Sequence, residues 1–418
     1  MQTPASPSLP GLTPRRELWL LVTLAGIQFT HILDFMIMMP LGPQFTALFG
    51  ISDAQFGLLV SAYTLAAGAS GLVASTYIDR FGRKRLLLVL YTLFGLATLA
   101  CGLAPTYGSL MAARIAAGIF GGVMSALSQT IVGDVIPFER RGRAMGIVMT
   151  SFSVSTVAGV PLGLFIAATW GWHASFIGIA VLCAVFAVFA ALTLPVLTAH
   201  LQHKDRPSAF GGVARVLADA NHRKAFLFSA LTMFSGFTVI PYITIYMQTN
   251  AGLRADQVPW VYLCGGVVTL FTARLFGRMT DFRGKVPTYR LLGIGMIVPM
   301  FALTLMQGLP VWAILVVSTC FFFSSSGRMI PGMAIVTSAA NPQLRGTFMT
   351  LNASMQSAAM GLAAFTGGLI IGRDADGLVS HYWMCAAVGA CASLCAVWIA
   401  GKLTLHGSAE KPRSAAGA

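Results

Sequence analysis

LWLLVTLAGIQFTHILDFMIMMP, residues 18–40, is an apolar stretch that contains a single acidic residue, Asp34. As an α-helix it is long enough to cross about 30 Å of hydrocarbon. The whole chain has the same character: of its 418 residues 56% are hydrophobic and 10% are charged, and the mean hydropathy is +0.77. Too few polar side chains remain to cover a water-soluble globule, so the composition indicates an integral membrane protein.

Similar apolar runs follow along the chain, and they lack the short length and alternating polarity of β-barrel strands. The first run is too long for a signal peptide and has no small-residue cleavage site, so we expect it to remain as the first helix. The sequence predicts an all-α membrane protein with twelve transmembrane helices, at residues 18–40, 55–77, 86–104, 108–132, 144–168, 174–198, 224–248, 258–277, 287–307, 310–335, 346–371 and 382–402.

Lysine and arginine are unevenly distributed among the loops. If the N-terminus is inside the cell, 22 of the 27 basic residues fall in cytoplasmic segments, and only Arg254 and Arg373 lie in loops on the other side. Basic loops stay in the cytoplasm, so we predict a multi-pass protein of the bacterial inner (plasma) membrane with both termini cytoplasmic. The same distribution explains the net charge of +14 without a nucleic-acid partner, because no basic helix or patch collects the charges.

The two halves of the chain echo each other. The motif SerxxxAspArgPheGlyArgLys at residues 75–84 is matched by GlyxxxAspPheArgGlyLys at 277–285, and each follows the second helix of its half. Such a repeat indicates a duplicated six-helix unit. We therefore predict an N-terminal six-helix bundle at 1–198, a cytoplasmic linker at 199–223, and a C-terminal six-helix bundle with a short tail at 224–418.

These motifs resemble those of the major facilitator superfamily. Residues 75–84 are similar to its signature loop between helices 2 and 3, and RIAAGIFGG (114–122) resembles its helix 4 motif, in which a buried Arg is associated with proton coupling. LDFMIMMPLGP (33–43) and AGVPLG (158–163), the latter followed by GWHASF (171–176), resemble the twelve-span drug:proton antiporter branch and its arabinose-efflux-permease-like members. The resemblance implies two pseudo-symmetric six-helix bundles, with helices 1, 4, 7 and 10 lining a central cavity.

The resemblance also implies a gating role for the loop after helix 2, which would lock the halves together in the outward-facing state. Positive-inside anchoring alone explains the basic residues of this loop but not the acid among them. The residues concerned are Asp79, Arg80, Gly82 and Arg83, with Asp281 and Gly284 in the second copy.

In helix 5, Gly159, Pro161 and Gly163 remove side chains and one backbone donor, which favours bending and close helix approach. Packing without any consequence for transport direction is the alternative.

Asp34 stands apart from the other acidic residues. Twelve of the thirteen lie in loops, tails or span ends, and Asp34 alone is deep in a span. An ionised carboxylate there costs on the order of 3 kcal/mol, so it needs a partner, and Arg114 on helix 4 lies at the same depth. Burial favours the neutral acid and the guanidinium favours the carboxylate, so Asp34 is our candidate carrier of the transported proton. The alternative is a static ion pair that only fixes helix packing.

Other polar and aromatic residues in the spans are candidate substrate contacts. Gln28, His31 and Asp34 recur every three residues and form one polar stripe on helix 1. His31 suits a proton relay or a substrate contact, or a local hydrogen bond. Arg328 suits an anionic part of the substrate, or carbonyl groups freed by Pro331. The remaining candidates are Asn352 and Gln356, which suit substrate contact or interhelical hydrogen bonds, and the aromatic residues Phe237 and Tyr242.

We therefore expect a proton-coupled secondary transporter that exports a small drug-like or sugar-like molecule, as in multidrug efflux. A proton-coupled importer is the alternative, and a non-transporting sensor lacks a soluble domain with which to signal. No nucleophile–base pair, Walker loop or metal-ligand cluster indicates an enzyme, a metal or a cofactor. The seven cysteines lie in spans without a CxxC pair, so we expect no disulfide. The expected partners are the substrate, protons and the lipid bilayer, and a monomer suffices.

Overall fold

The computed structural model describes residues 13–195, 197 and 209–406, which are mostly helical. The N-terminal half contains α1 (Pro14–Ile37), α2 (Gly42–Phe49), α3 (Asp53–Tyr77), η1 (Ile78–Arg80), α4 (Arg83–Gly102), α5 (Tyr107–Gly121), α6 (Met124–Val135), α7 (Phe138–Val154), η2 (Ser155–Gly159), α8 (Val160–Trp170) and α9 (Trp172–Thr193). The C-terminal half contains α10 (Ala209–Ala218), α11 (Ala220–Phe237), η4 (Ile240–Tyr242), α12 (Ile243–Thr249), η5 (Ala255–Gln257), α13 (Val258–Arg283), α14 (Lys285–Gly295), α15 (Ile297–Thr304), α16 (Val311–Ala339), η6 (Pro342–Leu344), α17 (Arg345–Ile370), β1 (Gly372–Arg373), β2 (Val379–Ser380) and α18 (Tyr382–Ala400).

Twelve helical segments in the described part of the chain are long enough to cross a membrane. Eleven of them are also strongly apolar. The twelfth, α17, has 26 residues and is richer in glycine, serine and threonine, and it packs against α3 and α11. The predicted all-α membrane fold of twelve helices in two six-helix bundles is confirmed.

Several predicted spans are interrupted. The span predicted at 18–40 is α1 followed by a turn that contains Pro40, after which α2 begins. The span predicted at 224–248 already begins at Ala220 and breaks at η4, which contains Pro241. Proline has no N–H to continue a helix, which explains both breaks. α10 lies in the segment predicted as a linker.

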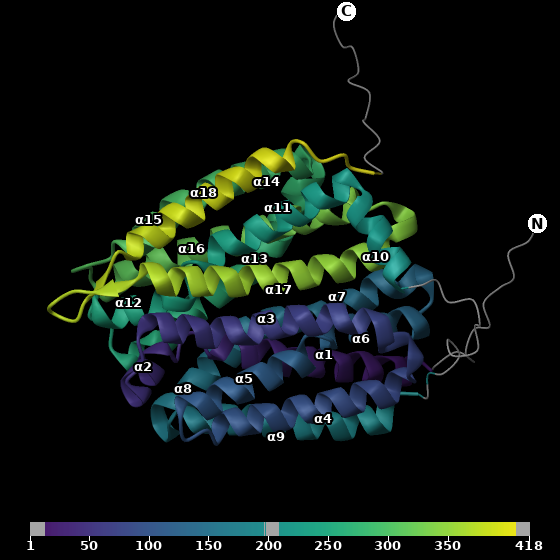
Figure 1. Cartoon of the computed structure of the whole chain (residues 1–418), viewed down its shortest axis with the longest axis horizontal. Helices are drawn as coiled ribbons and strands as arrows, with labels where there is room; N and C mark the ends of the chain where they lie inside the picture. The colour runs from purple at the N-terminus through teal and green to yellow at the C-terminus, as the bar shows by residue number, and fades with distance from the viewer. Residues whose placement is uncertain (1–12, 196, 198–208, 407–418) are drawn as a thin grey trace, which may run out of the picture.

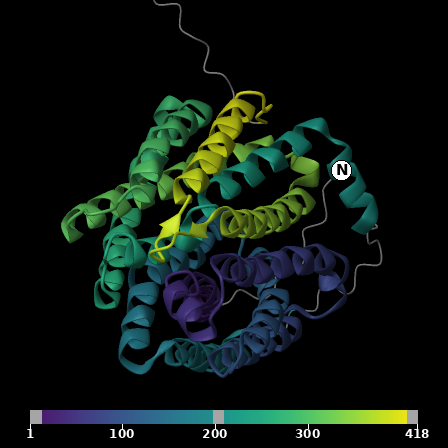
Figure 2. The same cartoon turned by 60° about the vertical axis from the view of Figure 1, so that its left-hand side comes forward.

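The two halves lie one above the other in Figure 1, with the N-terminal half in purple and blue below the C-terminal half in green and yellow. Figure 2 shows the same two bundles from another side. α1 begins and α18 ends at one end of the molecule, which we call the terminal end. The opposite end carries α2, α12 and the short hairpin of β1 and β2, in which Gly372 pairs with Ser380, and we call it the hairpin end.

α3 and α17 run side by side where the two halves meet (Figure 1). Small residues line their contact. A Cβ atom on Gly68 would lie 3.0 Å from the carbonyl oxygen of Ser354, and one on Gly71 would lie 2.9 Å from Ser354 Oγ. From the other side, a Cβ on Gly361 would lie 2.7 Å from Thr64 Oγ1. Glycine therefore lets the two backbones approach closely, as in other membrane helix pairs.

A π-helical turn, η2, interrupts the fifth span. The N–H of Val160 donates to the carbonyl oxygen of Ser155, five residues earlier, instead of to the residue four earlier. The next residue, Pro161, has no N–H to donate, so the normal helical ladder is also broken there. η2 and α8 both pack against α13 of the other half. The irregular turn therefore lies at the boundary between the two bundles.

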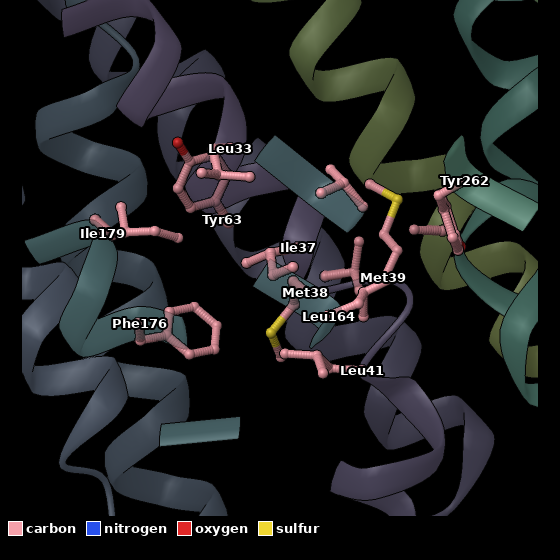
Figure 3. Packing of buried hydrophobic residues seen from close by; sticks show 14 of the residues in the cluster. Leu33, Ile37, Met38, Met39, Leu41, Tyr63, Leu164, Phe176, Ile179 and Tyr262 are labelled. Carbon is pink, nitrogen blue, oxygen red and sulfur yellow. The ribbon is translucent and has the colours of Figure 1, made fainter. Parts of the chain in front are cut away.

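Two glycines of the same span face α1. A Cβ on Gly159 would lie 3.0 Å from Leu33 Cδ1, and one on Gly163 would lie 2.7 Å from Ile37 Cδ1. Figure 3 shows Leu33 and Ile37 in the buried cluster that also contains Leu164 of α8. The two glycines thus allow α1 to pack closely against η2 and α8.

Gly118 on α5 offers a test of this close packing. A Cβ atom there would collide with the carbonyl oxygen of Tyr63 on α3 and lie 3.0 Å from Ala66 Cβ. We expect Gly118→Ala to lower the free energy of unfolding by about 1–3 kcal/mol, although alanine favours an isolated helix. Thermal unfolding in detergent measures this effect. The control is Gly108→Ala in the same helix, where no atom lies within 4 Å; equal stability of the two variants would contradict the packing.

Candidate functional site

Asp34 lies near the end of α1 and is fully buried. Its Oδ1 atom accepts a hydrogen bond of 3.2 Å from the hydroxyl of Thr98 on α4. Its Oδ2 atom accepts a 2.9 Å hydrogen bond from Nη1 of Arg114 on α5. The structure thus brings Asp34 and Arg114 together as an ion pair in the interior of the N-terminal bundle.

Arg114 is also fully buried, and it makes two further contacts. Its guanidinium carbon lies 4.3 Å from the ring centroid of Tyr63, in a cation–π contact, and Nη1 lies 3.4 Å from the backbone oxygen of Asp34. Nε has no hydrogen-bond partner among the described residues. Tyr63 was not predicted from the sequence, because a tyrosine in an apolar span has no distinguishing pattern.

The rest of the polar stripe on α1 continues toward the terminal end. Gln28 Nε2 donates a 3.0 Å hydrogen bond to Ser125 Oγ of α6, and Ser125 Oγ lies 3.3 Å from Gln28 Oε1, to which it can donate. His31 packs beside Tyr63 and Phe94, with ring centroids 6.3 and 5.7 Å away. Neither ring nitrogen of His31 has a hydrogen-bond partner among the described residues. The two ring nitrogens of His31 are therefore buried with their hydrogen-bonding capacity unused, although the residue as a whole is only partly buried.

An aromatic stack joins the two halves beside this site. The Phe35 ring of α1 stacks on Tyr63 with centroids 5.5 Å apart and on Phe237 of α11 with centroids 6.0 Å apart. Phe237 was a candidate substrate contact, whereas Phe35 was not singled out. Tyr242 lies deeper in the boundary: it is fully buried, and its hydroxyl donates to the carbonyl oxygen of Ala364. Its ring also packs against the N-terminal half, with its centroid 6.2 Å from that of Phe56 on α3.

Arg328 on α16 is the buried cation of the C-terminal half, with 2% of its surface exposed. Its Nη1 atom donates to Ser235 Oγ at 3.1 Å and Ser393 Oγ at 3.4 Å, and Nη2 donates to the carbonyl oxygen of Thr232 at 2.8 Å. Nε has no partner in the described part of the chain. Every acceptor is neutral, and the accepting carbonyl belongs to α11, not to the turn preceding Pro331.

Asn352 and Gln356 of α17 differ in their hydrogen bonds. Gln356 Nε2 donates a 3.0 Å hydrogen bond to Ser229 Oγ, which ties the two helices together. Asn352 is almost fully buried, and its Oδ1 atom has no partner among the described residues. Asn352 therefore has a free acceptor, whereas the amide of Gln356 is engaged.

The loop after α3 is held by contacts within its own half. Arg83 Nε lies 3.3 Å from Asp134 Oδ2 of α6, and Arg83 Nη1 donates to the carbonyl oxygen of Ile78 at 3.1 Å. Arg80 is exposed, and the side chain of Asp79 lies outside the described part of the structure.

The glycines of the two loops differ in conformation. Gly82 has an ordinary φ of −61°, whereas Gly284 has a φ of +89°, which favours glycine. Asp281 is exposed in the second copy. A sharp reversal that requires glycine therefore occurs only in the second loop.

At the hairpin end an ion pair links the halves. Arg373 of β1 donates to both oxygens of Asp53, from Nε at 2.9 Å and from Nη2 at 3.0 Å. Asp53, at the start of α3, has a side chain only 3% exposed, and that of Arg373 is 37% exposed. Asn250 of the C-terminal half also exchanges two hydrogen bonds of 2.9 Å with Val379 and so holds the hairpin. This pairing could not be predicted from the sequence, because both charges lie in predicted loops far apart in the chain.

Comparison with known proteins agrees with this architecture. A profile of the Major Facilitator Superfamily matches residues 24–364 and 225–416. The chain is 24% identical to a chloramphenicol efflux pump of Mycobacterium tuberculosis over 364 residues, or 87% of this chain and 86% of the pump. It is also 24% identical to the uncharacterised MFS-type transporter YtbD of Bacillus subtilis, over 78% of this chain and 82% of that protein.

Solved structures share the fold at lower sequence identity. A D-xylose-proton symporter superposes with a TM-score of 0.73 at 18% identity, covering 94% of this chain and 98% of the symporter. A bacterial homologue of the human lysosomal transporter Spinster, in an inward-facing and occupied conformation, superposes with a TM-score of 0.70 at 17% identity. The match covers 94% of this chain and 98% of the homologue. From the profile match across nearly the whole chain and the two-bundle fold, we conclude that the chain belongs to the major facilitator superfamily, whose members are membrane transporters and not enzymes.

Proposed function

We propose that the protein is a proton-coupled secondary transporter that exports a small organic molecule by alternating access. The observation that carries this proposal is the buried pair of Asp34 and Arg114 between α1 and α5. An ionisable pair at membrane depth is costly and is typical of ion and proton pathways. The similarity to a chloramphenicol efflux pump supports export, as does the resemblance of AGVPLG at 158–163 to the antiporter motif.

The pair can couple proton binding to a change of shape. Protonation of Asp34 removes the charge that holds Arg114, and it leaves the guanidinium to the ring of Tyr63 and the backbone oxygen of Asp34. One proton that enters across about 100 mV and one pH unit releases roughly 3.7 kcal/mol, of which about 2.3 comes from the voltage. This energy suffices for a gradient of several hundredfold in a neutral solute.

The orientation follows from the basic loops. The loops at the terminal end hold most of the Lys and Arg residues, so we assign this end to the cytoplasm and the hairpin end to the periplasm. At the hairpin end Asp53 pairs with Arg373, and Tyr242 fills the boundary nearby. We infer that the described state is closed to the periplasm and that export requires these contacts to separate.

The substrate site in this proposal lies between α1, α11 and α17. Phe35 and Phe237 offer aromatic surface, while His31 and Asn352 offer polar atoms without protein partners among the described residues. Such a combination of apolar walls and a few polar groups suits a drug-like or sugar-like molecule. Gln28 and Gln356 already bond to serines and would have to exchange these partners.

Asp34→Asn tests the coupling. In everted vesicles with an acidified interior, an exporter accumulates substrate as protons leave, and chloramphenicol with a panel of fluorescent dyes serves as the probe. We expect Asp34→Asn to lower pH-driven uptake more than tenfold, because the amide cannot exchange a proton. The control Asp256→Asn changes an exposed acid paired with Arg254 and is expected to transport normally. Full uptake by Asp34→Asn contradicts the proposal, and loss of preloaded substrate along with protons indicates an importer.

Arg114→Gln tests whether the two charges act as a pair. The substitution leaves Asp34 buried without its cation, so we expect the free energy of unfolding to fall by about 3–5 kcal/mol. In the double variant Asp34→Asn/Arg114→Gln no charge is left unpaired. We expect its free energy of unfolding to fall by less than the sum of the decreases in the two single variants. Thermal unfolding of all four proteins in detergent gives the comparison. Strictly additive losses would show that the two side chains are not coupled.

The ion pair at the hairpin end is expected to bias the transporter toward the state closed to the periplasm. Asp53→Asn removes the negative charge from a pair joined by two hydrogen bonds. We expect this to weaken the contact between the halves by about 1–3 kcal/mol. Spin labels at positions 48 and 376, one on each half, report the separation by electron–electron resonance. We expect longer distances between the labels in Asp53→Asn than in the wild type. In the charge swap Asp53→Arg/Arg373→Asp we expect the distances to return to those of the wild type. An unchanged distance distribution in Asp53→Asn would exclude this role.

A further inference from the structure

The two halves place an arginine against equivalent positions of their first helices. Pro40 follows α1 and Pro241 follows α11, and when these prolines are aligned, Asp34 falls opposite Ser235. In the N-terminal half, Nη1 of the buried arginine donates to the residue at this position at 2.9 Å. In the C-terminal half the same atom of Arg328 donates to Ser235 Oγ at 3.1 Å. Arg114 and Arg328 stand at different levels of α5 and α16, but both donate to this position of the first helix, which carries a carboxylate in only one half.

Arg328 carries a charge that no described acidic side chain neutralises. Its contacts are the hydroxyls of Ser235 and Ser393 and the carbonyl oxygen of Thr232, all of which are neutral. A glutamine could supply similar hydrogen bonds without the cost of burying a charge inside a membrane protein. A merely structural tie between α11, α16 and α18 therefore does not explain why the residue is an arginine.

Arg328 keeps a buried hydrogen-bond donor that is available to an anion. Nε is buried and has no hydrogen-bond partner among the described residues. Gly236 brings the backbone of α11 against the guanidinium: a Cβ there would lie 3.3 Å from Arg328 Nη2, 3.4 Å from Ile240 Cδ1 and 3.9 Å from Ser325 Oγ. A guanidinium edge with a free N–H matches the two oxygens of a carboxylate. The hydroxyl of Ser325 is an additional donor nearby.

We propose that Arg328 binds a monovalent anion, the carboxylate of the transported molecule, at the position where the N-terminal half carries its own carboxylate. This inference rests on the proposed transport function and specifies its substrate class as amphipathic organic acids. The transported molecule then completes in the C-terminal half the charge pair that Asp34 and Arg114 form in the other. Export of such an anion against an entering proton moves two charges per cycle in the direction favoured by the membrane potential.

Substitutions at Ser235 provide the sharpest test. Ser235→Asp places a carboxylate beside Arg328 and is expected to compete with the ligand, whereas Ser235→Asn is the matched neutral control. The purified full-length protein is titrated in detergent with sodium benzoate, with neutral benzamide and with sodium chloride, and the shift in melting temperature is followed. We expect benzoate, but not benzamide, to stabilise the wild type and Ser235→Asn. In Ser235→Asp and Arg328→Gln we expect benzoate to bind at least tenfold more weakly.

Each other outcome overturns the proposal. Equal stabilisation by benzoate in Arg328→Gln or Ser235→Asp, or no benzoate effect on the wild type, shows that Arg328 does not bind carboxylates. Stabilisation by chloride alone shows a site for inorganic anions and not for the transported molecule. If Arg328→Gln does not fold, Ser235→Asp still tests the proposal, because this variant retains the arginine. Without ligand we expect Ser235→Asp to melt at a higher temperature than Ser235→Asn, since its carboxylate pairs with Arg328.

A further variant separates this proposal from the proton-coupling mechanism. Asp34→Asn is expected to keep benzoate binding while losing pH-driven transport, because Asp34 and Arg328 belong to different bundles. Loss of benzoate binding in Arg328→Gln with intact binding in Asp34→Asn supports the anion site even if the coupling proposal fails. Loss of binding in Asp34→Asn alone contradicts the assignment of the anion to Arg328.

Discussion

The burial of one carboxylate and one guanidinium together, between α1 and α5, is the constraint on which the rest of the structure depends. Either charge alone would be costly at membrane depth, so each side chain stabilises the other. Thr98 and Tyr63 complete the surroundings with a hydrogen bond and an aromatic face. Because the pair is stable only while both charges are present, a single proton can change the balance between these helices.

In our proposal the two-bundle architecture converts this local change into a movement of one bundle against the other. The halves meet along α3 and α17, where Gly68, Gly71 and Gly361 bring the two helices close together. Such a seam suits small rotations of one bundle against the other. The π-turn η2 places a second irregular contact at the same boundary, against α13. The halves are equivalent in fold yet differ in chemistry, because Ser235 occupies the position of the N-terminal carboxylate.

The fold and the pair of Asp34 and Arg114 could be predicted from the sequence, because both depend on the length, hydropathy and depth of helical segments. Helix length and hydropathy revealed the spans, and equal depth placed Arg114 beside Asp34. The sequence could not indicate Thr98, because threonine is common in apolar helices and only its three-dimensional position makes it a donor. The pairing of Asp53 with Arg373 could not be predicted either, because the sequence does not show which loops of the two halves lie close together in space. The low hydropathy of α17 follows from packing against protein instead of lipid, which composition alone does not show.

The most direct measurement is proton release when substrate binds to the purified protein in weakly buffered detergent, followed with a pH-indicator dye. If Asp34 exchanges a proton for substrate, the wild type releases up to about one proton per chain, and Asp34→Asn releases none while still binding substrate. Equal release by both proteins, or no release by a wild type that binds substrate, would contradict the claim that this carboxyl group couples protons to transport.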